Sequence, residues 1–522
     1  MLMAFKTIPF VIAFLVCTWM QLQGFEKKKN LIFALTTDHA VHCFGLYDKP
    51  FATIDPTPFL DHLGSKGILF RNAFSTIGSL NPTPATFLLK GFDSAKPVST
   101  VPESNSFAFD FKKQGYKTAY FGPWEWQIDP RDAGFEYWEI LEKPNVFFNP
   151  VLKSPFTEIT FEGHTTDVLT DRCLEWLEKS DPEIPFFIFL SYNGTTRPWM
   201  PPIRYINQFD GEWLEIPKNF FTSFVSNAPA SRYQRMNIQS ELHPHSDLFF
   251  PQTESEESTG IYQSNLEKMN EEQASAWRIG WVPKNEAFIR ESPKDDSLAR
   301  WKFQRFAKNY LRCIRAIDEN CQRLSNYLVS SERKDTYFAY TAKSGRFLGE
   351  KGWYGKRWMY DQVMKVPLLL SDLSSLSTVP HVHTPSVIHA DFLDIISFIS
   401  KERNSSIDQI VSNLEKINRT LIYYSHLDAQ NKENVCPHIG LRTKNFKLIH
   451  FFPFDEWEFF DLSIDPLEGQ NQYNNHLYQS ELTKMKGYLK KFMSSLDKNY
   501  TNPVYFSEEW KRSQRVAEKK TR

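Results

Sequence analysis

Apolar runs recur along the chain, and most of them follow a segment with helical spacing. Residues 31–37 read LIFALTT, a run that ends in polar residues as a buried parallel strand does. Residues 57–70 predict a helix closed by glycine and then a strand, and residues 107–122 repeat this order with Gly115 at the helix end. Residues 164–192 predict a further helix, a proline-bearing turn and an apolar strand.

The segment 300–328 also has helical spacing. Its regularly spaced apolar residues are Phe303, Phe306, Tyr310, Cys313, Ile317, Cys321, Leu324 and Leu328. A strand with the sequence TYFAYTA follows. This alternation of helices and apolar strands predicts an α/β fold with a mostly parallel central sheet and helices on both faces. Catalytic groups are then expected beyond the carboxyl ends of the strands.

Three later segments depart from this alternation. Residues 225–297 are polar and predict an insertion or a long surface loop, although the run HPHSD at 243–247 is similar to a set of metal ligands. Residues 401–510 favour antiparallel strands joined by turns, with an amphipathic helix at 480–496, and predict a smaller α+β domain. Residues 511–522 form a basic tail, expected to be solvated and at most in weak contact with anionic glycans.

The N-terminus has the features of a secretory signal. Lys6 precedes an apolar run from Ile8 to Met20, which is shorter than the about 20 apolar residues of a spanning helix. We therefore predict a signal peptide at 1–24 and the α/β domain at 25–400, with an uncleaved anchor as the alternative. No later segment is apolar enough to cross a bilayer.

Charge and glycosylation triplets narrow the location and the partners. The formal net charge of −1 gives no basic field for nucleic acid. Four asparagines are glycan acceptors if they lie on the surface: Asn193, Asn404, Asn418 and Asn499. Together with the signal they favour a secreted or lumenal protein, in the endoplasmic reticulum, the lysosome or the extracellular space.

The cysteines do not predict a disulfide framework. Five cysteines follow the predicted signal, which is an odd and sparse set for a large secreted chain. Cys313 and Cys321 are about 12 Å apart on the predicted helix, too far to bridge, and are expected in the core. No pair of cysteines has the spacing of zinc ligands.

Several segments carry a shared family pattern. In chain order they are TTDHA with Tyr47, SLNPTPATFLLKG at 79–91, GYKTAYFGPWEW, PFFIFLSYNGTTRPWMPP, FAYTAKSGRFLGEKGWYGKRWMYDQVMKVPLLL, and LRTKNFKLI with EFFDLSIDPLEGQN. In this order they resemble the sulfatase family, a branch of the alkaline phosphatase superfamily. The segment at 79–91 lies where the family's Cys/Ser-x-Pro-Ser-Arg signature is expected.

The resemblance implies a definite chemistry. A formylglycine hydrate, made from Cys or Ser, attacks sulfur, and a divalent cation, usually Ca²⁺, orients it and neutralises the sulfate oxygens. Lys and His side chains bind the anionic ester and protonate the leaving oxygen.

The residues at the catalytic positions depart from this pattern. Leu80 stands at the nucleophile position and cannot become formylglycine, and Pro84 replaces the Arg that would hold the aldehyde hydrate. The other Lys and His positions carry Pro123, Glu125 and Thr196.

The metal-ligand positions are also altered. Only Asp38 keeps a carboxylate, and the other positions carry Thr37, Lys343 and Ser344. An ammonium at Lys343 would repel a cation.

Two of these side chains allow a second explanation. Lys356, in GKRWMY, keeps the lysine that binds sulfate in the family. It could instead pack its aliphatic chain against neighbouring aromatic side chains or pair with Glu350. Asp38 and Lys343 could form an ion pair that replaces the metal, and a separation above about 6 Å would exclude this.

The leading hypothesis is a secreted or lumenal sulfatase-fold protein that is catalytically inactive. It would act by binding a ligand or partner, through the former active-site cleft or through residues 225–297. No cofactor is then expected, although Ca²⁺ and formylglycine are the cofactors of the family. The expected partners are sulfated glycans or an active sulfatase homologue.

Two alternatives stay open. One is an active hydrolase with Ser79 or Thr83 as nucleophile and a metal site rebuilt from His39, His42 or the HPHSD run. The other is an inert subunit that stabilises or regulates an active homologue.

Overall fold

The structure of the protein is a computed structural model. It describes residues 28–47, 51, 54–76, 106–124, 128–221, 228–251, 260–331, 333–375, 381–388, 391, 407–414, 416–428, 433–451, 453–495 and 510–511.

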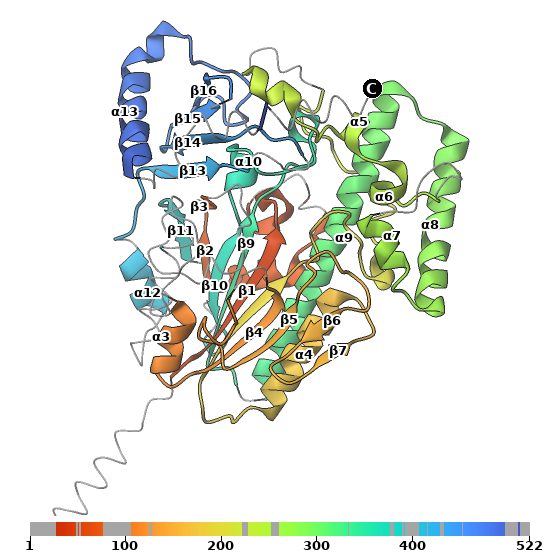
Figure 1. The fold of residues 1–522 in the computed structure, drawn as a ribbon. Helices are drawn as coiled ribbons and strands as arrows, with labels where there is room; N and C mark the ends of the chain where they lie inside the picture. Colours follow the sequence, from red (N-terminus) through yellow and green to blue (C-terminus); the bar gives the residue numbers. More distant parts are fainter. Residues whose placement is uncertain are drawn as a thin grey trace, which may run out of the picture.

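A ten-stranded sheet forms the centre of the molecule (Figure 1). Its strands are β1 (Asn30–Asp38), β2 (Ile68–Phe70), β4 (Lys117–Pro123), β5 (Tyr137–Leu141), β6 (Val151–Lys153), β7 (Glu158–Thr160), β8 (Phe186–Tyr192), β9 (Thr336–Ser344), β10 (Leu368–Asp372) and β11 (His381–His383). Their order is β11-β2-β10-β9-β1-β8-β4-β5-β6-β7. The run from β9 to β5 is parallel, and antiparallel pairs occur at β10 and at the β6–β7 edge. The prediction of a mostly parallel sheet is confirmed. A second, two-stranded sheet pairs β3 (Ala73–Phe74) with β12 (Val387–Ile388).

Helices cover both faces of the large sheet, as predicted. They are α2 (Pro58–Gly64), α3 (Phe107–Lys113), α4 (Thr165–Lys179), α9 (Asp295–Ser330) and α12 (Ile407–Leu414). Leu31, Phe33 and Leu35 of β1 share a core with α3 and α12, because alternate side chains of a strand point to the same face. Ile32 and Ala34 share the opposite core with α2, α4 and α9. Burial on both faces explains why this strand is apolar throughout.

The C-terminal part forms a separate antiparallel sheet, at the top of Figure 1. Its strands are β13 (Ile422–His426), β14 (His438–Arg442), β15 (Phe446–Phe451) and β16 (Glu456–Asp461), with α13 (Gln479–Ser495) packed on one face. The predicted α+β unit is therefore present. Asp361, the first residue of α10 (Asp361–Met364), connects α10 to this sheet, because its carboxylate accepts from Arg442 Nε of β14 at 2.9 Å and from Lys447 Nζ of β15 at 2.8 Å.

Residues 225–297 contain several helices where the structure describes them, which differs from one long loop and leaves the alternative of an insertion open. They contain α5 (Ile238–Glu241), α6 (Pro244–Leu248), α7 (Ile261–Leu266) and α8 (Glu271–Glu291). A capping box starts α8: Asn270 Oδ1 accepts from Gln273 N at 2.8 Å, and Gln273 Oε1 accepts from Asn270 N at 3.1 Å. Trp277 and Trp281 bury one side of α8 in a core cluster, which stabilises a helix inside a polar sequence.

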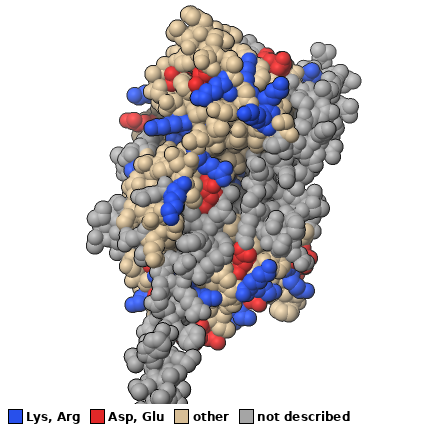
Figure 2. Space-filling view, turned by 90° about the vertical axis from the view of Figure 1, so that its left-hand side faces the viewer, with Lys and Arg blue, Asp and Glu red and all other residues tan. Residues whose placement is uncertain are grey.

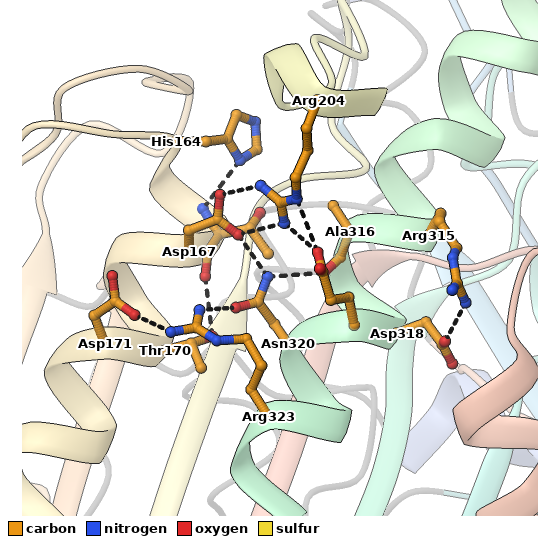
Figure 3. Close-up of polar contacts among 12 residues, drawn as sticks. His164, Asp167, Thr170, Asp171, Arg204, Arg315, Ala316, Asp318, Asn320 and Arg323 are labelled. Carbon is orange, nitrogen blue, oxygen red and sulfur yellow. Dashed lines mark hydrogen bonds and ion pairs between the residues drawn. The ribbon is translucent and has the colours of Figure 1, made fainter. Parts of the chain in front are cut away.

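Polar contacts fasten α4 to α9 along their shared edge (Figure 3). Arg204 donates to Asp167 Oδ2 at 2.6 Å and to Glu319 Oε2 at 2.9 Å. Asn320 is buried, and its Nδ2 donates to Asp167 Oδ1 at 2.7 Å and to Ala316 O at 2.8 Å. The exposed ion pairs contribute little each, so the buried amide is the stronger link between the two helices.

Asp318 of α9 caps the start of α2. The preceding Thr57 makes no side-chain cap, and the buried Asp318 carboxylate accepts instead from Leu60 N at 2.8 Å and from Phe59 N at 3.2 Å. Arg315 donates to the same carboxylate at 2.8 Å (Figure 3). The long helix thus satisfies backbone donors that α2 leaves open.

The five cysteines that follow the predicted signal are free and buried, as expected for Cys313 and Cys321; the other three are Cys43, Cys173 and Cys436. Among the described helices, none combines the length and the hydropathy of a membrane span.

We expect Asp318→Ala to lower the free energy of unfolding by about 2–4 kcal/mol, because two backbone donors lose a buried acceptor. Urea unfolding would measure this. Glu178→Ala, an exposed change on α4, is the matched control and should stay within about 0.5 kcal/mol of the parent. Equal effects of the two substitutions would contradict the capping role.

Candidate functional site

Most of the predicted site residues that the structure describes meet at the carboxyl ends of neighbouring strands. Thr37 and Asp38 end β1, and Lys343 and Ser344 end β9, with Asp38 in register with Ser344. Thr196 follows β8, the other neighbour of β1, and the buried Pro123 ends β4 beyond it. The expectation that catalytic positions gather at this edge fits the topology.

Asp38 is the centre of the cluster. Its side chain is fully buried, with 0% exposure. Arg346 Nη2 lies 2.6 Å from Oδ2, and Lys356 Nζ lies 2.5 Å from Oδ1. Ser344 Oγ also donates to Oδ1, at 3.0 Å. Both carboxylate oxygens are therefore occupied by donors from the polypeptide.

The two cations decide the charge state of Asp38. Burial raises the pKa of its carboxyl, but the Lys356 ammonium and the Arg346 guanidinium outweigh this and lower the pKa to about 2. Asp38 is thus an anion at any physiological pH.

These partners differ from those considered from the sequence. Lys356 pairs with Asp38, whereas Glu350 lies 3.2 Å from His42 Nε2. Arg346 and Lys356 are both in contact with Asp38, and neither contact was foreseen from the sequence.

Sequence reasoning missed Arg346 altogether. Its Nη1 donates to Tyr354 O at 2.7 Å, and its guanidinium lies over the Trp199 ring, 5.2 Å from the centroid. The signal that could have found it is its place two residues after Ser344, directly beyond the end of a buried strand.

Threonine hydroxyls link β1 to the turn after β8. Thr195 Oγ1 accepts from Asp38 N at 3.0 Å and lies 3.1 Å from Thr36 Oγ1 and 2.9 Å from Thr37 Oγ1. Thr37 Oγ1 lies 3.0 Å from Thr196 Oγ1. Thr37 and Thr196, two of the degenerate positions, are therefore hydrogen-bonded to each other.

Several predicted positions lie outside the described residues. They are Leu80, Pro84, Glu125, Asn404, Asn499, the segment 1–24 and the tail from 512. Of the remaining glycosylation triplets, Asn418 is exposed. Asn193 is 1% exposed, and its Nδ2 donates to Pro144 O at 2.7 Å and to Val146 O at 2.9 Å. The surface condition set for a glycan acceptor is therefore not met at Asn193.

The other candidate metal ligands are engaged elsewhere. His39 Nδ1 lies 2.8 Å from Tyr340 Oη. In the HPHSD run, which begins α6, Arg197 Nε lies 2.6 Å from Asp247 Oδ1 and His245 Nδ1 lies 2.8 Å from Phe250 O.

Among the family's metal-ligand positions, Asp38 is the one that keeps a carboxylate. Ca²⁺ takes about 6–8 oxygen ligands in proteins. At the strand ends the one carboxylate is shared between two cations, and elsewhere in the described ranges no group of three or more His, Cys, Asp or Glu residues could hold a metal ion.

Known proteins resemble this chain over most of its length. It is 28% identical to an N-acetylglucosamine-6-O-sulfatase of Bacteroides thetaiotaomicron, over 91% of this chain and 87% of that protein. It is 21% identical to an uncharacterised sulfatase, YidJ, of Escherichia coli, over 94% of this chain and 92% of that protein. A structure solved in complex with its substrate D-glucosamine-2-N,6-O-disulfate superimposes with a TM-score of 0.81 and 27% identity, covering 90% of this chain and 98% of that chain.

Two family models match the chain. The model described as sulfatase matches residues 29–397, and that described as N-sulphoglucosamine sulphohydrolase, C-terminal, matches residues 349–495.

These comparisons correct the expectation that no cofactor is needed. Sulfatases are enzymes that use Ca²⁺ and formylglycine, and the match extends to a relative named for sulfatase activity and to a structure holding its substrate. The expectation of a protein without cofactors, which rested on single positions of the sequence, is therefore wrong.

We expect Asp38→Asn to lower the free energy of unfolding by about 3–5 kcal/mol at neutral pH, since Arg346 then stays buried without a carboxylate. The folded-state pKa of about 2 lies below the ordinary 3.8, so the contribution of the charge is complete above that ordinary value and is lost as the pH falls toward 2. The difference between parent and variant should shrink over that range, measured by urea unfolding at several pH values.

Ser344→Ala is the control for this prediction. It removes one hydrogen bond to Asp38, should cost about 1 kcal/mol, and should leave the acid dependence of the parent unchanged. A parent–variant difference for Asp38→Asn that did not change with pH would contradict the ion-pair account.

The sheet topology, the place of the cluster at the strand ends and the comparisons agree with the family pattern of the sequence. Because the sulfatase model matches more than half of the 522 residues, this protein belongs to the sulfatase family.

Proposed function

We propose that this protein binds a sulfated amino sugar of the glucosamine 6-sulfate class at the strand ends and leaves the ester intact. The substrate class is supported by two relatives, one named as an N-acetylglucosamine-6-O-sulfatase and one solved with D-glucosamine-2-N,6-O-disulfate.

The charges of the cluster favour an anionic ligand. Arg346 and Lys356 supply two cations for the carboxylate of Asp38, and Lys343 adds a third positive charge at the end of the neighbouring strand β9. Ammonium and guanidinium groups form strong, charge-assisted hydrogen bonds with sulfate-like oxygens. The Lys356 side chain is 26% exposed, so part of it is accessible to a ligand.

The ion pairs of Asp38 are the main observation that supports a lack of catalytic turnover. In the family pattern this carboxylate is a ligand of the cation that orients the nucleophile, and here both of its oxygens hold cations of the chain. In the sequence, Leu80 stands at the nucleophile position, and its hydrocarbon side chain has no group that attacks sulfur. Ligand binding can persist under these conditions, whereas ester cleavage loses its attacking group.

A rewired hydrolase has less support. Ser79 and Thr83 lie outside the described residues, and His39 and His42, proposed for a rebuilt metal site, contact Tyr340 and Glu350.

We also propose that the chain enters the secretory pathway. The apolar run near the N-terminus supports this, and the exposed Asn418 triplet offers an accessible glycan acceptor.

The purified protein should bind N-acetylglucosamine-6-sulfate and should not release sulfate from it. Isothermal titration would measure binding, with unsulfated N-acetylglucosamine as the control ligand, and chromatography of the incubated sugar, in buffer with Ca²⁺, would measure turnover. Sulfate release that scales with protein concentration would overturn the proposal, and so would equal affinity for the two sugars.

Lys356→Gln should weaken binding of the sulfated sugar by about tenfold or more, because one charge-assisted hydrogen bond is lost. Lys484→Gln, an exposed change on α13, is the matched control and should bind like the parent. Unfolding curves of both variants show whether they are folded. Unchanged affinity of a folded Lys356→Gln protein would place the ligand elsewhere.

In a secretory host, Asn418→Gln should remove a mass that peptide-N-glycosidase otherwise releases. Asn193→Gln should leave that mass unchanged, because Asn193 is buried. Loss of a glycan in Asn193→Gln alone would contradict this assignment.

A further inference from the structure

Helix α8 has an apolar stripe on its outward side. Ile279 is 70% exposed, Val282 44% and Ile289 69%. Spacings of three and seven residues place them along one face of the helix, which lies at the outer edge of the molecule (Figure 1). Single exposed apolar residues are ordinary on protein surfaces, whereas apolar residues gathered on one face are a feature of surfaces that contact partners.

The fold does not need this stripe. Trp277, Trp281 and Asn285 are the buried residues of α8, and Trp277 and Trp281 pack into a core cluster with Phe249 and Tyr262. The inward side therefore holds the helix in place, and the outward residues have no structural role of this kind.

Charged residues flank the stripe in a symmetric pattern. Arg278 and Glu286 lie four residues before and four residues after Val282. Glu271 and Glu272 begin the helix, and Arg290 lies near its end. Across the described part of the chain, the structure gives none of these five side chains an ion-pair partner.

We propose that α8 is a contact between two copies of this chain, packed antiparallel about a twofold axis at Val282. In this arrangement Arg278 of each copy faces Glu286 of the other, and Arg290 comes near the acidic start of the opposite helix. A parallel arrangement would place like charges opposite one another. A twofold contact needs a surface that is complementary to itself, and this charge order meets that condition.

A membrane surface is a poorer occupant. Glu271, Glu272 and Glu286 outnumber Arg278 and Arg290, so the stripe is net negative. Helices that lie on anionic lipid carry a basic polar face instead.

The size of the helix sets the strength of the contact. Its 21 residues span about 31 Å, and one helix face is smaller than the about 800 Å² per partner of a standard stable interface. The dimer should therefore be weak, with a dissociation constant in the micromolar range or above. It shares no residue with the Asp38 cluster, so its failure leaves the proposed function untouched.

Charge reversal tests the proposal in the full chain. Sedimentation velocity over a concentration series should show the parent rising from monomer mass toward twice that mass. Arg278→Glu and Glu286→Arg should each weaken the dimer at least tenfold, and the double variant R278E/E286R should restore it. A parent that stays monomeric at high micromolar concentration, or a double variant no better than either single one, would overturn the proposal.

Cross-linking gives a second readout. Under mild oxidation Val282→Cys should form a disulfide-linked dimer, while the parent and Leu477→Cys, which is also highly exposed but lies outside α8, should not. The parent is a fair background because the cysteines of the described residues are buried. Equal cross-linking of the two variants would contradict a contact between two copies. Binding of the monomer to anionic vesicles would also contradict it, if Ile279→Ser abolished that binding.

Discussion

The ion pairs of Asp38 are the interaction on which the site depends. A fully buried carboxylate requires compensation, and here it comes from Arg346 and Lys356, which lie more than three hundred residues later in the chain. The parallel pairing of β1 with β9 brings these groups together, since the carboxyl ends of parallel strands meet at one edge. The sheet therefore fixes the chemistry of the cluster, and the cluster in turn joins two central strands at their ends.

The account of function follows from this arrangement. The chain keeps the sulfatase fold and a cationic edge suited to a sulfate ester, while the carboxylate at that edge is committed to the chain's own cations. Binding of a sulfate ester and its cleavage are separable, because binding needs positive charge whereas cleavage needs a positioned nucleophile. Under the proposed function, this family member recognises a sulfated sugar without cleaving its ester.

Much of the fold could be predicted from the sequence, because buried strands and amphipathic helices leave a periodic record. The place of Asp38 and Lys343 at strand ends was also predictable from motif order, whereas the pairing of Lys356 with Asp38 was not. Arg346 and the helix α8 were not: a single arginine after a strand has no period, and Trp277 and Trp281 are two apolar anchors within a polar segment. Asn193 shows the same limit, since its triplet carries no information on burial.

A crystal structure of the protein soaked with N-acetylglucosamine-6-sulfate tests the central claim most directly. The account predicts an intact ester with its sulfate group within hydrogen-bond distance of Lys356, and Asp38 still paired with Arg346. A desulfated sugar in the site, or free sulfate there with Asp38 released from Arg346, would contradict it.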